Sequence, residues 1–497
     1  MDDNLKLRTA NTVKWNAIDR IASQVLYAVT GIVLANVLSE EDFGLVGAIL
    51  VFQAFANLFV DSGFSSALIQ KKSPTETDYS TVLWFNIGVA TLIYAILWLT
   101  APLIASLFQG DQRLIPLSRV MFLSFIINAT AIVQTNRLMK QMDVKMIAIS
   151  DAVGLIISGI VGIWLAIEGY GAWAIVWQTI TLAVIKSAIL WLTSHWRPSA
   201  VFSTSSLRGI FKVGSGVMLT SFLNTVFLNI YSFFIGNRVG LRSLGYYTQA
   251  DKWSKMGTAS LSQILTSSFL APLSAVQDDQ ERFNRLLAKM NRFTAYVLFP
   301  SFVLLIVMAT PIFHLLFGTK WDPSIPLFQL LLLRGIFTVI SSLYSNYILA
   351  LGKAKMLVAM EILRDGVAIA AIIATLPFIS LSTPTNAIYG IEILLWGQVG
   401  ASALTCLVTM AVVARYTRRS LWLNIFDNVP YIALTLVAAV IPFFADKFVD
   451  NNTALLAVQA VAGFGIYFLL NKLFNSKIQK EAIDYFASRW RKKSPNK

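Results

Sequence analysis

The chain has 497 residues, of which 56% are apolar and only 13% are charged, with a net charge of +14 and a mean hydropathy of +0.66. Soluble domains hold about half apolar and about a quarter charged residues, so this composition excludes a soluble protein and indicates one that lies in a membrane. The single cysteine, Cys406, excludes an intramolecular disulfide and a thiolate metal cluster.

Apolar stretches long enough to cross a bilayer recur along the chain. A helix needs about 20 residues to span about 30 Å of hydrocarbon. We therefore predict an all-α integral membrane protein, and a β-barrel, with its short alternating segments, does not fit. The about 14 transmembrane helices that we expect lie at 14–38, 43–69, 79–106, 114–137, 146–168, 171–194, 210–236, 245–271, 291–316, 325–351, 356–378, 387–414, 428–446 and 453–474.

Basic residues are distributed unevenly over the loops between these spans. The two termini and the loops on their side hold most of the Lys and Arg residues. The opposite loops hold five, which are Arg113, Arg238, Arg242, Lys320 and Lys447. By the positive-inside rule, both termini are predicted to be cytoplasmic. Because the positive charge follows the topology, it does not indicate binding to nucleic acid.

A weak internal repeat relates the first twelve spans. A shift of 201 residues places Asn36 on Asn237 and Gly44 on Gly245, although two identities arise by chance about as readily. The repeat favours two parallel six-helix halves with a substrate site between them, an architecture typical of transporters. We expect an N-lobe at 1–195, a C-lobe at 196–420, two extra helices at 421–475 and a basic amphipathic cytoplasmic tail at 476–497.

No motif for nucleotide binding, zinc proteolysis or a serine nucleophile occurs in the sequence. The connections between spans are shorter than about 20 residues, too short for a soluble catalytic domain. These features predict a secondary transporter without a cofactor or metal, and not an enzyme. Uphill transport would then need a proton or sodium gradient, or removal of the product on the far side. A membrane glycosyltransferase or polymerase would need acidic residues in sizeable external loops.

Ionisable residues inside the predicted spans are the candidates for function, because each costs about 2.5–3.5 kcal/mol to insert and normally faces a cavity or a partner. Lys186, Arg334 and Arg119 have no opposite charge within four residues in sequence. Unpaired cations in a wet cavity suit a phosphate-bearing ligand. We predict that Lys186 and Arg334 contact a substrate diphosphate, and a partner on another helix is the alternative. Further candidates for this contact are Arg119, Lys252 and Arg364.

Two other polar features lie within the spans. Asp61, near the middle of the second span, is a candidate ion-coupling carboxylate, with an interhelical hydrogen bond as the alternative. In the fifth span small residues recur every fourth position, which predicts close helix packing and no ligand site. They are Ser150, Gly154, Ser158 and Gly162.

Several short strings occur in a fixed order along residues 1–420. They are Leu38-Ser39-Glu40-Glu41-Asp42-Phe43-Gly44, Asp61-Ser62-Gly63-Phe64-Ser65-Ser66-Ala67-Leu68-Ile69-Gln70, Gly169-Tyr170-Gly171-Ala172-Trp173-Ala174, Trp196-Arg197-Pro198, Leu244-Gly245-Tyr246-Tyr247, Pro272-Leu273-Ser274 and Phe317-Gly318-Thr319-Lys320-Trp321. In these strings the chain resembles the polysaccharide exporter and O-antigen flippase family of the multidrug/oligosaccharidyl-lipid/polysaccharide (MOP) superfamily. The last two helices match that family only in number.

The resemblance implies two six-helix lobes around a central cavity that opens alternately to the cytoplasm and the periplasm of a bacterial inner membrane. The substrate it implies is an undecaprenyl-diphosphate-linked oligosaccharide, the repeat unit of a capsule, O-antigen or exopolysaccharide. Expected partners are this lipid-linked oligosaccharide, membrane lipids, and polymerase and glycan-assembly proteins. A lipid II flippase and a drug/cation antiporter of the same superfamily remain alternatives, and the antiporter would need an acidic cavity.

Overall fold

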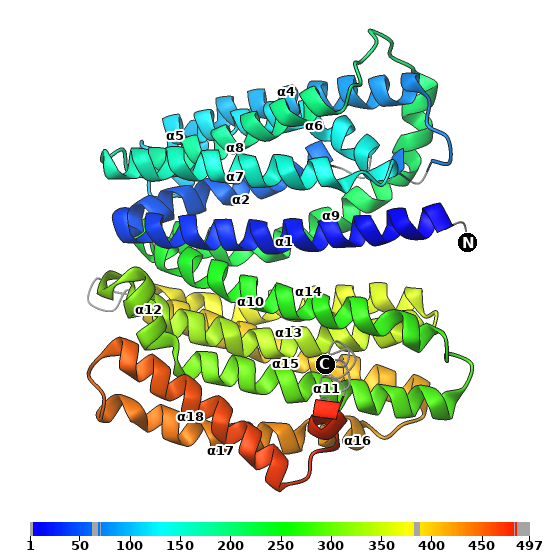
Figure 1. Ribbon diagram of the computed structural model, residues 1–497. Coiled ribbons are helices and arrows are strands. Elements are labelled where there is room, and N and C mark those ends of the chain that lie inside the picture. Colours follow the sequence, from blue (N-terminus) through cyan, green and yellow to red (C-terminus); the bar gives the residue numbers. More distant parts are fainter. Residues whose placement is uncertain (1–2, 62–67, 70, 382–387, 482, 485–497) are drawn as a thin grey trace, which may run out of the picture. The chain divides into compact units, whose positions relative to one another are not determined.

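The part of the chain described by the computed structural model is helical and contains no strand (Figure 1). It comprises residues 3–61, 68–69, 71–381, 388–481 and 483–484, without the side chains of 3–8, 10, 57–61, 209–221, 223–224, 265–268 and 271. The elements are α1 (Asp3–Val37), α2 (Glu40–Asp61), α4 (Glu76–Leu107), α5 (Leu114–Met121), α6 (Leu123–Lys140), α7 (Val144–Ile167), α8 (Ala172–Thr193), α9 (Thr204–Arg238), α10 (Leu241–Ser274), α11 (Gln280–Val307), α12 (Ala309–Phe317), η1 (Thr319–Trp321), α13 (Ser324–Ala350), α14 (Ala354–Thr375), η2 (Leu376–Leu381), α15 (Tyr389–Thr417), α16 (Leu421–Phe426), α17 (Val429–Phe444), η3 (Ala445–Lys447) and α18 (Asn452–Leu473).

The predicted all-α membrane fold is confirmed. Within the described ranges, 11 helical segments are long and apolar enough to cross a membrane, and each falls on a predicted span. The other three predicted spans, at 43–69, 210–236 and 245–271, fall on the long helices α2, α9 and α10. Each of these three helices includes positions whose side chains are not described.

Two of the predicted spans are each built from two helices. The span at 114–137 divides at Phe122 into α5 and α6, and the span at 291–316 divides at Met308 into α11 and α12. Pro311 explains the second break, because a proline removes one hydrogen bond of the helix and its ring clashes with the carbonyl four residues earlier. That carbonyl belongs to Val307, the last residue of α11.

Polar residues close the ends of several helices. Thr75 and Asp78 form a capping box at the start of α4, in which each side chain accepts a hydrogen bond from the backbone N–H of the other residue. Asp279 and Asn451 are simple N-caps of α11 and α18, since one side-chain oxygen of each accepts from backbone N–H groups of the first turn. The caps satisfy N–H groups that would otherwise lack a partner at the membrane boundary.

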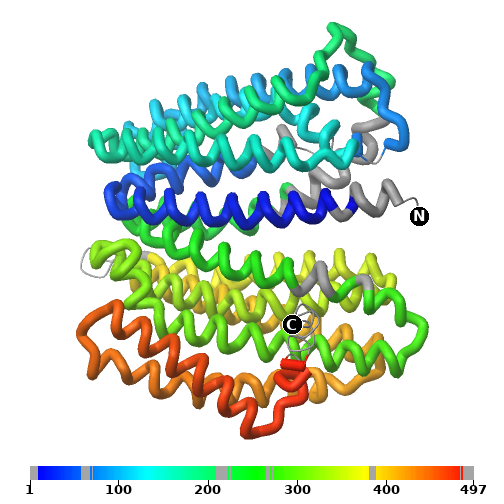
Figure 2. The backbone as a smooth tube through the Cα atoms, viewed as in Figure 1, coloured from blue at the N-terminus to red at the C-terminus, as the bar shows by residue number. Residues whose placement is uncertain are grey.

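The chain forms two compact units, which span residues 1–248 and 249–497 and run from blue to green and from green to red along the tube in Figure 2. In the first unit α7 packs against α1 and α8, α6 against α4 and α8, and α2 against α9. In the second unit α15 packs against α13 and α14, while α17 and α18 pack against each other and against α11. The lobe boundaries expected at residues 195 and 420 stay a prediction.

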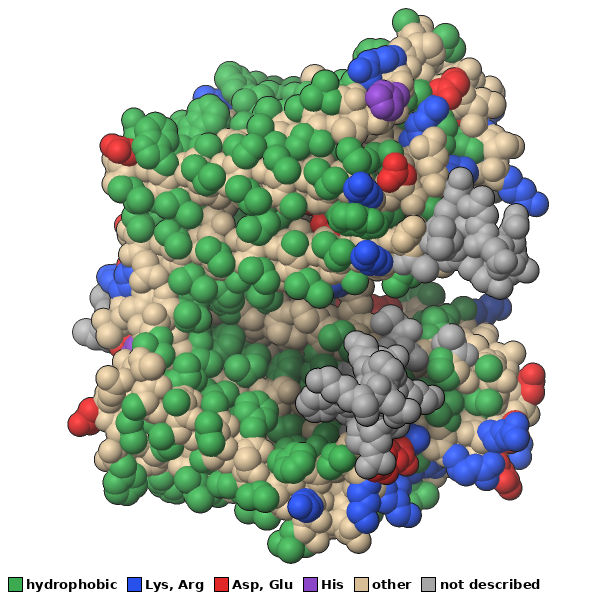
Figure 3. Space-filling view, in the orientation of Figure 1, with side chains coloured by type: hydrophobic (Ala, Val, Ile, Leu, Met, Phe, Trp, Pro, Cys, Tyr) green, Lys and Arg blue, Asp and Glu red, His purple; other side chains and the backbone are tan. Residues whose placement is uncertain are grey.

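The surface of each unit is apolar along the length of its helices. Large hydrophobic side chains are exposed there, including Leu99, Ile160, Trp164, Leu436 and Val461. Figure 3 shows hydrophobic side chains covering the flanks of the helices, with most Lys and Arg side chains near the helix ends. A protein dissolved in water rarely exposes apolar patches of this extent, so these flanks face lipid.

Candidate functional site

An ion pair lies inside the membrane-spanning part of the first unit. The Lys186 ammonium on α8 is 2.5 Å from Oδ1 of Asp151 on α7, and these side chains are 33% and 20% exposed. At about 1.5 Å per residue, each lies about 10 Å along its helix from the end that Val144 and Thr193 mark. The alternative left open by the sequence, a partner on another helix, therefore holds for Lys186, and its contact with a diphosphate stays a prediction.

A third charged group joins this pair from α1. Asp19 interacts electrostatically with both Asp151 and Lys186. The Ser23 hydroxyl, one turn along α1, donates a hydrogen bond to the Asp19 carboxylate at 3.4 Å. One cation thus faces two carboxylates in this cluster, which we call the unit 1 charge cluster (Asp19, Asp151, Lys186). The excess of carboxylate leaves a group that could bind a proton or a small cation.

Small residues on α7 allow α1 and α8 to approach closely enough to build this cluster. A Cβ atom at Gly154 or Gly162 would lie 3.0 Å from the side chains of Leu182 or Gln178 on α8. A Cβ atom at Gly159 would lie 2.9 Å from the Thr30 hydroxyl on α1. The prediction that small residues at every fourth position of α7 serve helix packing is confirmed.

Three of the other predicted cations have partners. The Arg119 guanidinium lies 4.0 Å from the centre of the Trp98 ring and donates to the Trp98 carbonyl at 3.2 Å. Lys252 lies 5.5 Å from the Trp253 ring, and Arg364 pairs with Glu361 at 2.5 Å. Pairing does not decide whether these side chains contact a substrate, so that role stays a prediction.

Arg334 differs from these residues. Its Nε is buried without a hydrogen-bond partner, and no carboxylate pairs with it among the residues that the structure describes. The next residue, Gly335, brings α13 against α10, since a Cβ atom there would lie 2.6 Å from the Thr258 hydroxyl. Arg334 therefore belongs to a part of the second unit where α10 and α13 are in contact.

The stretch of α10 that precedes Thr258 carries buried polar groups that lack partners. Both amide atoms of Gln249, the Oδ1 of Asp251, the Nε1 of Trp253 and the Oγ of Ser254 are buried without a hydrogen bond. The other carboxylate oxygen of Asp251 pairs with Lys255, four residues along the same helix, at 2.6 Å. We call residues 249–255 the α10 polar segment. Each such group costs about 1–3 kcal/mol unless water or a ligand satisfies it, so a polar ligand suits this segment.

Asp61, the candidate coupling carboxylate, is the last residue of α2. Its side chain lies outside the described residues, as do residues 62–67 that follow it. Its role stays a prediction.

At the other ends of the helices α2 and α10 cross with their backbones in contact. A Cβ atom at Gly44 would lie 1.8 Å from the carbonyl oxygen of Leu241, and one at Gly245 would lie 1.9 Å from that of Glu40. A shift of 201 residues converts each of these contacts into the other, so a local two-fold relation holds at this crossing. Isologous contacts of this kind arise when two equivalent elements meet at a symmetry axis.

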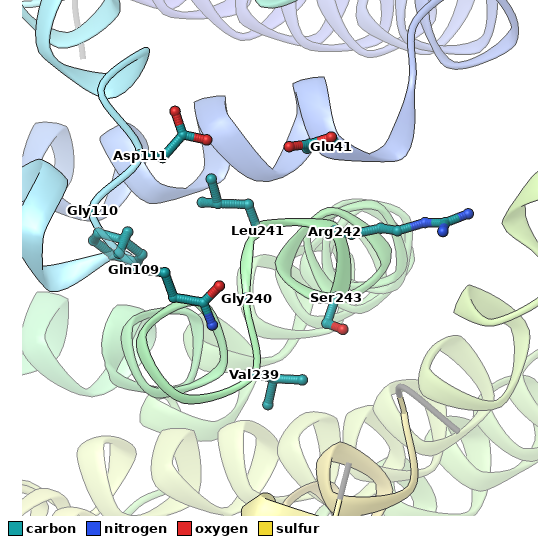
Figure 4. Close-up of a pocket in the computed structure, with 10 residues that line it drawn as sticks. Glu41, Gln109, Gly110, Asp111, Val239, Gly240, Leu241, Arg242 and Ser243 are labelled. Atoms are coloured by element: carbon teal, nitrogen blue, oxygen red, sulfur yellow. The ribbon is translucent and has the colours of Figure 1, made fainter. Parts of the chain in front are cut away.

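A polar pocket of about 460 Å³ opens beside the crossing, between Glu41, the loop Gln109–Asp111 and the α9–α10 connection (Figure 4). Arg113 binds both the Glu41 carboxylate and Asp111, the latter at 2.6 Å. Its hydrogen bond holds the pKa of the Asp111 carboxyl below its usual range. Glu41 and Asp111 thus share one guanidinium, which links the start of α2 to the loop between α4 and α5 beside this pocket.

The strings that carry the family resemblance meet one another in this region. Asp42 accepts a hydrogen bond from the backbone N–H of Ala172 at 2.8 Å, beside Gly171, whose φ of 56° favours glycine. The first string thus contacts the Gly169–Ala174 string through Asp42 and the Leu244–Tyr247 string through Glu40. At the opposite helix ends, Trp196 donates to Glu76, which also pairs with Arg137 at 2.9 Å.

The fold resembles that of solved transporters. The lipid II flippase MurJ, in an inward closed conformation, matches 92% of this chain and 98% of its own with a TM-score of 0.72 and 17% identity. An inward-facing multidrug resistance MATE family transporter of the MOP superfamily matches 80% of this chain and 94% of its own, with a TM-score of 0.60 and 16% identity. At these identities the likeness establishes the fold alone, and the fold is that of MOP transporters.

Sequence relatives define the family. Residues 33–326 match the model of a family described as "Polysaccharide biosynthesis protein". The succinoglycan biosynthesis transport protein ExoT of Rhizobium meliloti is 24% identical over 99% of this chain and 98% of its own, and the lipopolysaccharide biosynthesis protein WzxC of Escherichia coli is 23% identical over 74% and 75%. The chain belongs to this family of polysaccharide biosynthesis proteins.

Sequence reasoning missed two features of these sites. It did not connect Lys186 with Asp151, although each lies about one third of a span from the same predicted membrane face. It also did not foresee the buried polar groups of α10, although residues 249–255 form a polar stretch within a predicted span. Comparing the depths of charges on neighbouring spans would have suggested the ion pair.

Proposed function

We propose that this protein flips an undecaprenyl-diphosphate-linked oligosaccharide from the cytoplasmic to the periplasmic leaflet of a bacterial inner membrane by alternating access. The observation that carries the proposal is the full-length match to a succinoglycan biosynthesis transport protein within the same family. The oligosaccharide would be a repeat unit of a capsule, O-antigen or exopolysaccharide, and both termini would be cytoplasmic.

The α10 polar segment and Arg334 are the proposed contacts for the headgroup. A guanidinium presents several donors to a phosphate in a geometry that favours two parallel hydrogen bonds. The unpartnered groups of Gln249, Trp253 and Ser254 could bind sugar hydroxyls, which both donate and accept hydrogen bonds. The polyprenyl tail would stay in lipid while the headgroup crosses, because only the headgroup is costly to place in hydrocarbon.

A proton or sodium gradient is the proposed energy source. The unit 1 charge cluster offers two carboxylates for one ammonium, and Asp61 supplies a third carboxylate on α2. Binding of a cation to this excess negative charge would be coupled to the conformational change if one state of the protein favours the bound form. Lys186 would then adjust the affinity of the carboxylates, in addition to its predicted contact with a diphosphate.

The test measures how lipid-linked oligosaccharide distributes between the two leaflets of spheroplast membranes with and without the protein. Accumulation in the cytoplasmic leaflet on deletion is expected. Arg334→Ala should reproduce the defect at normal expression, whereas Lys355→Ala, which removes an exposed cation in the first turn of α14, should not. An unchanged distribution on deletion would refute the proposal.

Two rival functions give different results in related assays. A lipid II flippase is needed for the cell wall, so its depletion would lyse cells, whereas depletion of this protein should only remove surface glycan. A drug/cation antiporter would take up a fluorescent cation into proteoliposomes under an ion gradient. We expect no such uptake, because Arg334 places an unpaired positive charge in the proposed site.

A further inference from the structure

A second pocket lies in the other half of the chain, at the end of the second unit where α11 and α17 begin. It has a volume of about 540 Å³, and its walls come from the first turns of α11, from the α16–α17 connection and from residues 477–481 after α18. In Figure 1, the red segment that follows α18 lies beside α16. We call it the basic edge pocket.

Cations dominate its lining. Arg285, Lys289 and Arg292 follow one another at intervals of four and three residues, so they share one face of α11. All three are exposed, and Lys477 contributes a fourth positive charge from the opposite wall. Lys477 pairs with no carboxylate in the described ranges of the chain.

The carboxylates of the pocket leave much of this charge uncompensated. Asp427 is only 3% exposed and accepts from Arg292 at 2.8 Å and from Arg419 at 2.7 Å. Arg419, which is only 10% exposed, already compensates the charge of Asp427 from the protein interior. The hydrogen bond to Asp427 therefore holds Arg292 in one orientation and leaves its positive charge available to the pocket. The second carboxylate, Glu481, pairs with Lys289 at 2.6 Å, but both are more than half exposed, and such a pair is weak and easily exchanged.

Exposed apolar side chains lie next to the pocket in the chain. On the short helix α16, Trp422 and Phe426 are 66% and 58% exposed, and at the end of α18 Leu473 and Phe474 are exposed as well. Phe426 also lines the pocket itself. Aromatic side chains at the ends of spanning helices typically lie at the level of the lipid headgroups. The basic lining therefore borders a surface that suits acyl chains.

We infer that the basic edge pocket binds the phosphate headgroup of an anionic phospholipid of the surrounding leaflet, with the acyl chains against α16 and the end of α18. The site is separate from the α10 polar segment and does not depend on which substrate the protein transports. A lipid bound in this pocket would contact both α11 and the last two helices of the second unit. Because it binds only the folded state, it would stabilise the unit against unfolding.

The test uses the full-length purified protein in a neutral detergent and measures its thermal unfolding midpoint at increasing concentrations of phosphatidylglycerol, phosphatidylcholine or glycerol phosphate. Phosphatidylglycerol alone should raise the midpoint. Arg285→Gln combined with Lys289→Gln should weaken this response, since each cation near an anionic lipid contributes about a fivefold change in affinity. The matched control, Lys353→Gln with Lys355→Gln, removes the same charge from the start of α14, on the same predicted side, and should respond as the wild type does.

Three results would overturn the inference. Equal stabilisation by glycerol phosphate would show a site for a free phosphate ester and not for a lipid. An equal loss of lipid stabilisation in the control variant would show that the effect of the lipid depends on the net charge of the protein alone. A wild-type response in the Arg285 and Lys289 variant would place the lipid elsewhere, and if that variant is unstable without lipid, Lys477→Gln alone provides the same comparison.

Discussion

The crossing of α2 and α10 makes alanine an informative substitution at Gly44 and Gly245. A new Cβ atom would lie 1.8 Å or 1.9 Å from a backbone carbonyl oxygen, whereas carbon and oxygen normally stay at least about 3.3 Å apart. The helices would have to separate by about 1.5 Å, because a carbonyl within a helix cannot rotate away. Overpacking of this kind costs about 1–3 kcal/mol and exceeds the gain of about 1 kcal/mol that alanine brings to an isolated helix.

Thermal unfolding of the purified protein would measure this effect. Gly44→Ala and Gly245→Ala should each lower the midpoint by several degrees, at about 2–4 °C for each kcal/mol in a unit of this size. Gly88→Ala on α4 is the control, since no atom lies within 4 Å of its Cβ position, and it should leave the midpoint unchanged or slightly raised. If the two crossing variants are as stable as Gly88→Ala, the backbone contact does not hold these helices together.

Three further experiments test the ion pairs, and each of them measures the stability of the variants by unfolding. Lys186→Met should destabilise the first unit by about 1–3 kcal/mol because Asp151 loses its partner, and adding Asp151→Leu should restore much of the loss; no recovery would contradict the pairing. Asp427→Asn should lower the free energy of unfolding by about 3 kcal/mol, because it leaves the nearly buried Arg419 without a counter-charge. Glu281→Gln, which breaks a mostly exposed pair, should lower it by under about 0.5 kcal/mol. Similar losses in the two variants would argue against a stabilising buried network. The hydrogen bond from Arg113 lowers the pKa of Asp111 below its ordinary 3.8, so the stability that this carboxylate contributes is present above pH 3.8 and is lost as the pH falls through the lower pKa of the folded state. Asp111→Asn should remove that part of the acid-induced loss of stability, which amounts to under about 1 kcal/mol. An unchanged acid profile in this variant would show that the pair with Arg113 has no energetic effect.

The sequence by itself determined the class of the protein and the location of its spanning segments. Hydropathy over about 20 residues decides whether a segment crosses a bilayer, and this property is local to the segment. The break at Met308 was also within reach of the sequence, because Pro311 acts on its own helix. The strings at helix ends were sufficient to recognise the family, since they mark turns and helix crossings whose geometry depends on particular residues such as Gly171 and Gly44.

Only the tertiary structure decided which charged groups meet. Lys186 pairs with Asp151, and Arg119 packs on Trp98, because neighbouring helices present these side chains to each other. Such pairing depends on the rotation and depth of two helices together, which no single segment encodes. Among the five candidate cations, Arg334 is the one for which the described residues show neither a carboxylate nor an aromatic partner, and the contact between Gly44 and Leu241 likewise depends on how two helices cross.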